Sequence, residues 1–188
     1  MKPAAALTTI ITLAAGHGIV TTPPARQVGD AFKAACGEQP FNNQKGDPYG
    51  NQQQLEQNAS SQKDFNATAC QFFMCKGYQL ADNTANVQAF TAGQTVQMKV
   101  DIRAPHTGDC NVSVIDLGSN TVIGQPMIEF QNYASTSTGV AKNNTDFEIT
   151  MPDVAAQCGQ AGKCAVQWWW DSRESDQTYM SCIDFTMA

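Results

Sequence analysis

The chain has 188 residues and a formal net charge of −6, with 42% hydrophobic and only 15% charged residues. Its length fits a single domain with a sizeable core. The acidic balance excludes a surface for nucleic acid or for an anionic membrane, because both require an excess of lysine and arginine. Neutral polar side chains must therefore cover most of the surface, which suits an uncharged partner.

Residues 1–16 have the features of a secretory signal peptide. They begin with a basic residue, Lys2, continue through an uncharged apolar run, and end in small residues. The run is too short to span a bilayer. Cleavage after Gly16 gives a mature domain of residues 17–188 that begins with His17. A cut one or two residues away is the alternative, and it leaves His17 without special status.

Seven cysteines behind an export signal indicate disulfide bonds rather than thiol chemistry, and their odd number leaves one without a partner in this chain. No second apolar stretch would anchor the chain in a membrane. Four Asn-x-Ser/Thr sequons are candidate glycosylation sites, at Asn58, Asn66, Asn111 and Asn143. These features together predict a secreted, extracellular glycoprotein.

Residues 37–69 are too polar for core strands and too long for an ordinary connection. A disordered linker is one interpretation, but Cys36 and Cys70 bracket the segment and favour an ordered, stapled loop, which is where function often lies. Helical periodicity is confined to one short piece around residues 52–62.

Strict alternation of apolar and polar residues predicts a half-buried strand over residues 95–104, where Val96, Met98, Val100 and Ile102 face one way. Further strands are predicted at residues 110–117, 146–151, 164–170 and 179–187. Turns rich in Gly, Asn, Asp and Pro separate them. This spacing predicts an all-β fold, a single antiparallel β-sandwich of the immunoglobulin or fibronectin-III type with long ordered loops.

The triple tryptophan at residues 168–170 suggests a platform for carbohydrate. Strand alternation favours another interpretation, because Trp168 and Trp170 share one face and Trp169 takes the other. We therefore expect at least part of the run to pack in the core.

The chain contains two histidines, His17 and His106. A chain that begins with His17 offers its ring and its free α-amine, whose ordinary pKa of about 7.7–8.0 lets a metal displace the proton. His106 offers a third nitrogen from a loop just past the 95–104 strand. Three nitrogens in a T-shaped plane suit one copper ion, since copper(II) prefers tetragonal nitrogen coordination. A solvated loop side chain is the alternative for His106.

Tyr179 lies on the last predicted strand, where its hydroxyl can approach the metal axially. Gln177 lies two residues earlier on the same face and can hydrogen-bond the tyrosine or an oxygen species on the metal. The alternative for Tyr179 is a core aromatic residue whose hydroxyl bonds to the backbone.

These motifs resemble those of the copper-dependent lytic polysaccharide monooxygenases, and most closely auxiliary-activity family 16, a fungal group. The resemblance is carried by HGIVTTPPARQ from His17, the Cys-Gly and DPYGN of the long loop, PHTGDCNVSVID around His106, and Gln-x-Tyr-x-x-Cys from Gln177. It implies that His17 and His106 are equatorial copper ligands, that Tyr179 is axial, and that Gln177 supports the site. It also matches Ala104 to the small residue above the copper of bacterial relatives.

The same resemblance favours a disulfide between Cys182 and either Cys70 or Cys75. Cys158 and Cys164 are close enough in sequence to close a hairpin. The remaining pairings stay open.

The activity implied by the resemblance is oxidative cleavage of cellulose, a β-1,4-glucan, with oxidation at the anomeric carbon. It requires an external electron donor, such as a small phenol, ascorbate or a redox protein, and oxygen or hydrogen peroxide. Insoluble polysaccharide would dock on a flat face of a monomer, with Tyr49 as a candidate stacking ring.

Three other classes of protein are alternatives. A glycoside hydrolase requires a pair of carboxylates about 5–9.5 Å apart, and nothing in the sequence nominates such a pair. A secreted, non-catalytic copper carrier would use a similar pair of histidines. A structural wall or effector protein would not need copper.

Overall fold

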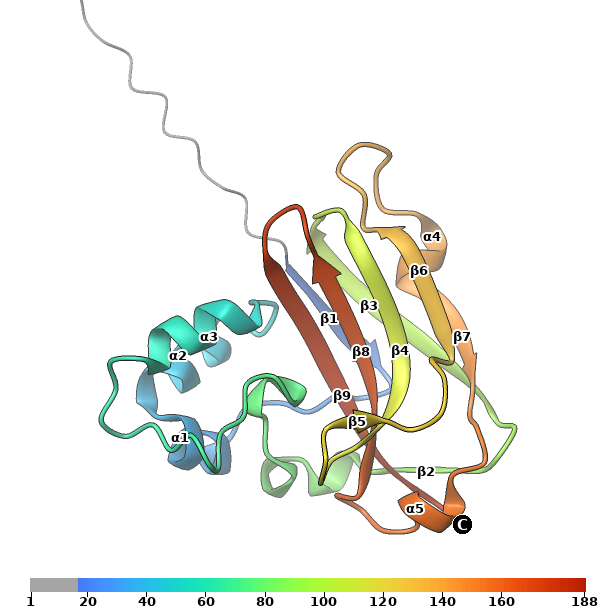
Figure 1. Ribbon diagram of the computed structural model, residues 1–188, viewed down its shortest axis with the longest axis horizontal. Helices are drawn as coiled ribbons and strands as arrows, with labels where there is room; N and C mark the ends of the chain where they lie inside the picture. Colours follow the sequence, from blue (N-terminus) through green and yellow to red (C-terminus); the bar gives the residue numbers. More distant parts are fainter. Residues whose placement is uncertain (1–16) are drawn as a thin grey trace, which may run out of the picture.

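The computed structural model describes residues 17–188, so the predicted signal peptide lies outside the described residues. Two packed β-sheets make up most of the molecule, which confirms the predicted all-β sandwich (Figure 1). The first sheet has the strand order β1 (His17–Thr22), β3 (Thr95–Ala104), β7 (Asp146–Thr150). The second has the order β2 (Gln88–Phe90), β9 (Gln177–Met187), β8 (Cys164–Ser172), β4 (Gly108–Asp116), β5 (Thr121–Val122), and β6 (Ile128–Tyr133) also pairs with β4.

The predicted strands correspond to β3, β4, β7, β8 and β9, and their bounds agree within a few residues. In β3 the predicted alternation is confirmed, because Val96, Met98 and Val100 are buried between exposed neighbours. The sequence did not reveal β1, β2, β5 and β6. β2 and β5 have three and two residues, β6 buries only Tyr133, and one of the two buried positions of β1 is a glycine, Gly18, so none of them shows a clear apolar alternation.

The core between the sheets is aromatic at its centre. Trp168 and Trp170 are fully buried, whereas Trp169 on the opposite face is only half-buried, so the core interpretation of the tryptophan run is confirmed. Tyr133 packs edge-on against both buried indoles, with ring centroids 6.2 and 5.7 Å away.

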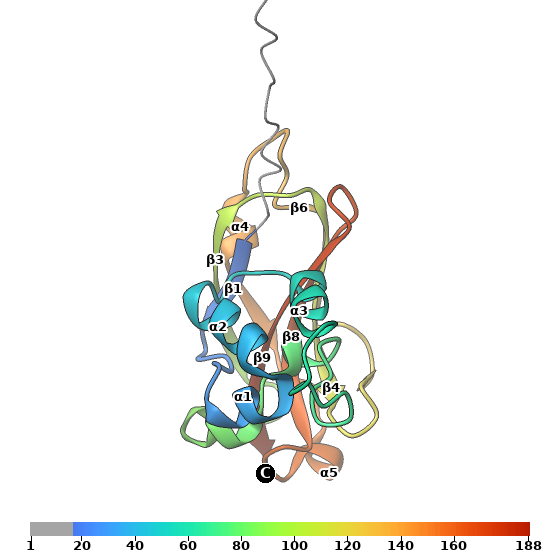
Figure 2. The same cartoon turned by 90° about the vertical axis from the view of Figure 1, so that its left-hand side faces the viewer.

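Three helices form a smaller layer beside β9, seen end-on in Figure 2: α1 (Asp30–Cys36), α2 (Glu38–Gly46) and α3 (Gln52–Ala59). They share their own core, in which Phe32 and Leu55 are fully buried. The prediction of an ordered segment at residues 37–69 is thus confirmed. Much of the segment is helical rather than irregular, and only the α3 part was predicted. The reason is that α2 buries only Pro40 and Gln44, which is too narrow an apolar stripe to show a helical period.

Short connections complete the fold. They comprise the 3-10 turns η1 (Cys75–Gly77), η2 (Leu80–Asp82) and η3 (Thr84–Asn86), and the single-turn helices α4 (Lys142–Thr145) and α5 (Ala155–Cys158). Across residues 17–188, no helix is long and apolar enough to cross a membrane.

Three disulfides staple the molecule. The predicted Cys158–Cys164 bond is confirmed, and Cys182 pairs with Cys75, one of its two predicted partners. The third bond joins Cys36 to Cys70 and closes the helical segment. The odd cysteine is Cys110, which is buried and has no disulfide partner. Three disulfides fit a secreted protein.

The four sequons differ in their exposure. Asn66 and Asn143 are exposed, whereas Asn58 and Asn111 are half-buried. Asn111 also accepts a hydrogen bond from the hydroxyl of Ser113, the third residue of its own sequon. Glycosylation itself stays a prediction.

Candidate metal centre

Three segments that are distant in sequence meet at one end of the sandwich. His17 is the first residue of β1, and its Cα pairs with that of Ala104 at the end of β3. His106 lies two residues further on, in the β3–β4 connection. The hairpin between β8 and β9, which leads into Gln177, is at the same end in both views (Figures 1 and 2). The fold therefore gathers all four predicted site residues into one region.

The backbone just after His17 lies directly on the buried tryptophans. A Cβ atom on Gly18 would be 3.2 Å from ring atoms of both Trp168 and Trp170, tighter than most real contacts. Glycine at this position therefore lets β1 sit close to the core. The ring of Tyr179 also stacks on Trp170, with the two ring centroids 4.5 Å apart. Trp170 is thus a shared support for the strand that begins with His17 and for Tyr179.

Gln177 and Tyr179 contact each other as the sequence predicted. They lie on one face of β9, and the Tyr179 hydroxyl donates a hydrogen bond to Oε1 of Gln177. The Tyr179 side chain is almost wholly buried, so the alternative of a core aromatic residue is correct for its ring. Its hydroxyl donates to the Gln177 side-chain amide, as the site interpretation requires.

The loop that carries His106 is fixed by Glu174 of the β8–β9 hairpin. The Glu174 carboxylate accepts hydrogen bonds from the backbone N–H of Thr107 at 2.8 Å and from the hydroxyl of Thr136 at 3.2 Å. These bonds, the Thr107 one foremost, lower the pKa of Glu174 below its ordinary value, and the charge of nearby His106 contributes. Glu174 therefore ties the hairpin, the His106 loop and the segment after β6 together.

Close backbone contact also fixes the exit of this loop. A Cβ atom on Gly108 would lie 2.2 Å from the carbonyl oxygen of Asp171 and 2.7 Å from Cα of Ser172. Because no side chain fits there, β4 and β8 approach each other directly beside the His106 loop.

The side chain of His17 contacts the segment that follows α2. Its Nε2 lies 2.8 Å from Oδ2 of Asp47, and both side chains are partly exposed. The backbone N–H of Gly18 also points at the carbonyl oxygen of Tyr49, 3.4 Å away. The DPYG sequence therefore lies against the start of β1.

Tyr49 occupies a different position from that expected of a stacking ring. The residue is only 7% exposed, and the Arg103 guanidinium lies over its ring, 3.5 Å from the centroid. Its hydroxyl donates a 2.7 Å hydrogen bond to Asp101. Burial and this bond raise the pKa of Tyr49. The surface here presents Arg103 rather than the aromatic face, so a sugar could stack on Tyr49 only if Arg103 moved.

These residues fit a copper ion held by nitrogen. Two imidazoles on opposed strand ends, with the α-amine that cleavage before His17 would create, supply the donor set that copper(II) prefers. Among the residues described, no group of three or more His, Cys, Asp and Glu side chains could hold a metal. A site of two imidazoles and an amine does not require such a group.

A family model described as lytic polysaccharide mono-oxygenase, cellulose-degrading, matches residues 17–185. The chain belongs to this family. It is accordingly a copper-dependent lytic polysaccharide monooxygenase, an oxidoreductase that acts on polysaccharide with an external reductant and oxygen or hydrogen peroxide. The alternatives of a glycoside hydrolase, a copper carrier and a structural protein are therefore set aside.

Solved structures similar to this chain have low sequence identity. A lytic polysaccharide monooxygenase from Jonesia denitrificans is 16% identical, with 92% of this chain and 100% of that chain covered and a TM-score of 0.43. A chitin binding domain from Burkholderia pseudomallei is 15% identical over 92% and 100%, with a TM-score of 0.47. A monooxygenase of auxiliary-activity family 15 from Thermobia domestica, in its Cu(I) state, is 14% identical over 92% and 99%, with a TM-score of 0.42. A search of curated proteins returned no match.

Sequence reasoning did not identify Asp47 and Glu174 as parts of this lytic polysaccharide monooxygenase site. Asp47 begins the Asp-Pro-Tyr-Gly sequence, which is typical of a turn but gives no indication of contact with a histidine on a distant strand. Glu174 sits in a hairpin whose tip, once β8 and β9 are paired, must lie beside the β3–β4 connection. The pairing of β4 with β8 would have indicated that Glu174 lies beside the His106 loop.

Proposed function

We propose that this monooxygenase is secreted, is cleaved between Gly16 and His17, and cuts cellulose by oxidation at the anomeric carbon. The observation that carries the proposal is the position of His17 at the first residue of β1, across from Ala104 and close to the loop of His106. A ligand that contributes its α-amine has to be the first residue of the mature chain. His17 would be that residue, and it lies close to the loop that carries His106.

In this proposal His17 and His106 would hold the copper, and Tyr179 would lie beside it. When bound, the copper supplies one-electron redox chemistry toward oxygen or hydrogen peroxide. The protein keeps the ligands in place: Glu174 fixes the His106 loop, and Trp170 supports both Tyr179 and the strand of His17. Gln177 holds the Tyr179 hydroxyl and presents its amide group toward the same region.

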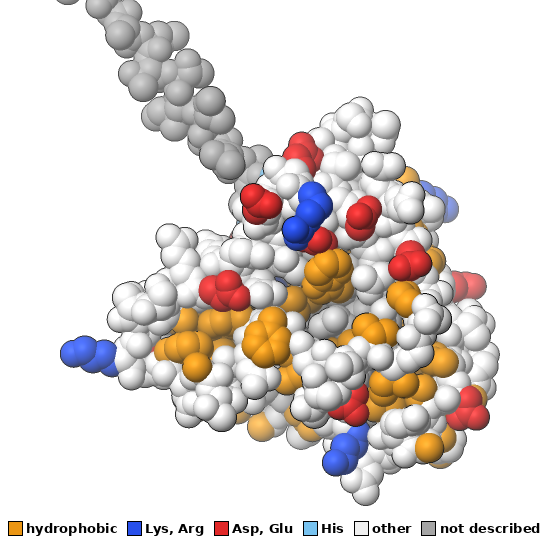
Figure 3. Space-filling model, viewed as in Figure 1, with side chains coloured by type: hydrophobic (Ala, Val, Ile, Leu, Met, Phe, Trp, Pro, Cys, Tyr) orange, Lys and Arg blue, Asp and Glu red, His pale blue; other side chains and the backbone are white. Residues whose placement is uncertain are grey.

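The substrate assignment rests on the family description, which names cellulose, and on surface chemistry. Only 15% of the residues are charged, which suits an uncharged glucan. The face in Figure 3 has a hydrophobic area across its middle, and several acidic side chains lie around a basic one near its upper edge. The finer assignment to auxiliary-activity family 16 rests on the motifs around His17 and His106 alone, because the matching family model does not support that fungal specificity. We further propose that the protein acts as a monomer with a small phenol, ascorbate or a redox protein as reductant.

The test is a product analysis with the mature protein. Copper-loaded protein is incubated with ascorbate and cellulose, and soluble products are examined by mass spectrometry. We expect oligosaccharides that carry an oxidised sugar at the former reducing end, dependent on both copper and ascorbate. Oligosaccharides with ordinary reducing ends, released equally well without copper, would contradict the proposal.

A further inference from the structure

A polar contact distinguishes the two nitrogens of the His17 ring. Nε2 lies 2.8 Å from Oδ2 of Asp47, a distance typical of a charge-assisted hydrogen bond. An ionised carboxylate can accept a hydrogen bond but cannot donate one. In this pair Nε2 is therefore the donor and carries the proton. The neutral ring then carries its lone pair on Nδ1.

This tautomer matters for a metal site that includes the α-amine. Nδ1 is the ring nitrogen nearer the backbone, so it can close a small chelate ring with the α-amine of the same residue. Nε2 points away from the backbone and cannot. Metal-ligating histidines commonly donate their second ring N–H to a carboxylate, which fixes the ring and raises its basicity.

Asp47 is itself held from two sides. Its other carboxylate oxygen, Oδ1, accepts a 3.1 Å hydrogen bond from the N–H of Tyr49, and its own N–H bonds to the carbonyl of Asn43 at 2.8 Å, at the end of α2. The carboxylate thus has one oxygen that shapes its own turn and one that reaches His17.

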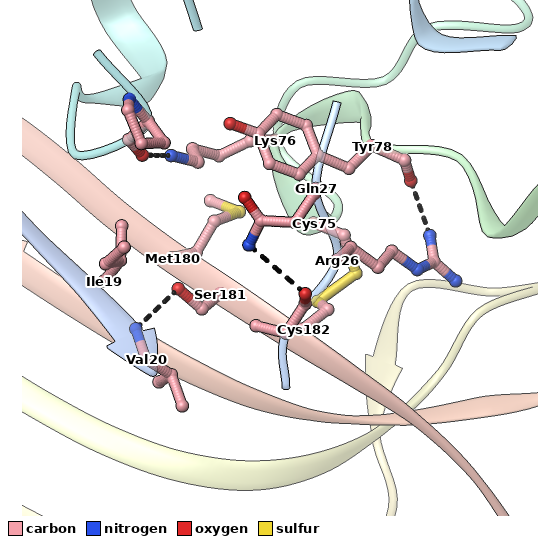
Figure 4. A pocket seen from close by; sticks show the side chains of 12 residues that line it. Ile19, Val20, Arg26, Gln27, Cys75, Lys76, Tyr78, Met180, Ser181 and Cys182 are labelled. Atoms are coloured by element: carbon pink, nitrogen blue, oxygen red, sulfur yellow. Dashed lines mark hydrogen bonds between the residues drawn. A yellow bond between two sulfur atoms is a disulfide. The ribbon is translucent and has the colours of Figure 1, made fainter. Parts of the chain in front are cut away.

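A buried lysine fixes the rest of this turn. Lys76 donates hydrogen bonds from Nζ to the carbonyl oxygens of Pro48 at 2.7 Å and Gly50 at 3.3 Å, and to the Gln44 side chain at 3.0 Å. Figure 4 shows it extended beside the ring of Tyr78. Burial lowers the pKa of Lys76 to about 7, and the charge of Asp47 opposes that shift.

The same lysine is anchored to the strand that carries Tyr179. The residue before it, Cys75, forms the disulfide to Cys182 of β9, drawn in yellow in Figure 4. A continuous path of bonds and hydrogen bonds therefore runs from β9 through Lys76 to the Asp47 turn and on to His17. The turn is a fixed support rather than a loose loop.

From this geometry we propose that Asp47 is a positioning residue for the copper site: it holds the His17 ring through Nε2 and so directs Nδ1 to the metal. The proposal rests on the copper site proposed above. Asp47 does not itself bind copper. Its role is to fix the proton and the orientation of the ring before the metal arrives.

Three variants of the mature protein separate this role from that of the turn. Asp47→Ser keeps a hydroxyl that can accept from Tyr49 N–H but is too short to reach His17. Asp47→Asn keeps an oxygen that can accept from Nε2 without the charge. Asp153→Asn is the matched control, because Asp153 is exposed and accepts a hydrogen bond from the N–H of Ala155 in its own loop.

Two measurements are made on each protein. Nitrogen-15 NMR of the metal-free form locates the imidazole proton. Calorimetry and the EPR spectrum then give the Cu(II) affinity and coordination. Thermal unfolding establishes that each variant is folded.

We expect the proton on Nε2 in the wild type and in Asp153→Asn, and a mixture of tautomers in Asp47→Ser. Copper affinity of Asp47→Ser should fall by about 10–100-fold, with an altered EPR spectrum, and Asp47→Asn should lie between. A wild-type proton on Nδ1, or wild-type affinity and spectrum in Asp47→Ser, overturns the proposal. Failure of the copper site is a separate result: a wild type that binds no copper would overturn that site, while the metal-free NMR measurement still reports on Asp47.

Discussion

At the scale of single residues, Tyr179 has two functions that can be separated. Its ring belongs to the core, because it is almost wholly buried and stacks on Trp170 at 4.5 Å. Its hydroxyl belongs to the candidate site, because it bonds to Gln177. Removing only the oxygen atom therefore tests the site and leaves most of the packing unchanged.

We predict that Tyr179→Phe binds copper with nearly wild-type affinity but has an altered copper spectrum or a slower oxidative turnover. An axial phenol contributes little to affinity, whereas its polarity affects the metal. The lost hydrogen bond should cost about 0.5–1.5 kcal/mol of unfolding free energy. Calorimetry, EPR and turnover on cellulose measure these effects. Gln177→Ala should impair turnover further, because its amide would act on the reacting oxygen rather than in metal binding.

Tyr133→Phe is the matched control for that prediction. Tyr133 is also fully buried, and its hydroxyl donates to the Asn144 carbonyl at 2.5 Å. The control should lose stability while its copper spectrum stays unchanged. Wild-type turnover and spectrum in both Tyr179→Phe and Gln177→Ala would show that this part of β9 is structural only.

The second residue-scale prediction concerns Glu174 and pH. Its pKa is lowered from 4.5 in the folded protein, so the folded state favours the ionised carboxylate. Its stabilising contribution is therefore present above the unfolded pKa and is lost as the pH falls through the lower, folded pKa. Glu174→Gln should be less stable than wild type at about pH 6, and the difference should shrink as the pH falls below the unfolded pKa. Urea unfolding of both proteins at about pH 6 and at successively lower pH measures this. An equal difference across this range would show that the charge is irrelevant.

At the scale of elements, the contact between β4 and β8 sets the position of the His106 loop. Gly108 permits that contact, since a Cβ atom there would overlap backbone atoms of Asp171 and Ser172. Neither neighbour is a flexible side-chain tip that could turn aside. The strands must separate to accommodate any larger residue.

We predict that Gly108→Ala destabilises the fold by about 1–3 kcal/mol, as is typical of overpacking. It should also change the copper EPR spectrum, because the loop that ends at Gly108 contains His106. Gly46→Ala is the control: a Cβ atom on Gly46 would have no neighbour within 4 Å, so alanine should be tolerated there without loss. Chemical unfolding and EPR compare the two variants, and an equal response of both would contradict the role given to Gly108.

Elements also determine how much of this protein the sequence could predict. The strands β3, β4, β8 and β9 carry most of the buried side chains: β3 alternates strictly, whereas β9 is buried at nearly every position, and these apolar segments made the sandwich visible in the sequence. The two-residue period of a strand also predicted the shared face of Gln177 and Tyr179. The end of the predicted 95–104 strand placed His106 in the loop that follows it. Asp47 could not be predicted, because it meets His17 only through the packing of the segment after α2 against β1. The cover of Arg103 over Tyr49 was equally hidden, since it depends on a contact between the segment after α2 and β3.

At the scale of the whole molecule, the candidate ligands are spread over residues 17, 106 and 179. They meet only when both sheets are packed, so copper should bind the folded mature protein far better than the unfolded chain. A ligand with that preference raises the unfolding free energy, by about 2.7 kcal/mol when its concentration is 100 times Kd.

We therefore predict that copper raises the melting temperature of mature protein and that a chelator reverses the rise. A variant with one extra residue before His17 should melt like the metal-free mature protein and should gain little from copper, because its α-amine is now in a peptide bond. Calorimetric melting with and without Cu(II) measures this. An equal gain in the extended variant would show that the amine is not a ligand.

The Cys75–Cys182 disulfide places oxidised sulfur three residues from Tyr179 in an enzyme that consumes reducing equivalents. Both cysteines are only 2% exposed, so a thiolate cannot reach them for the in-line attack that disulfide exchange requires. The bond is therefore shielded from thiols by its packing with Ile115 and Ala165, and loss of that packing would expose it to exchange.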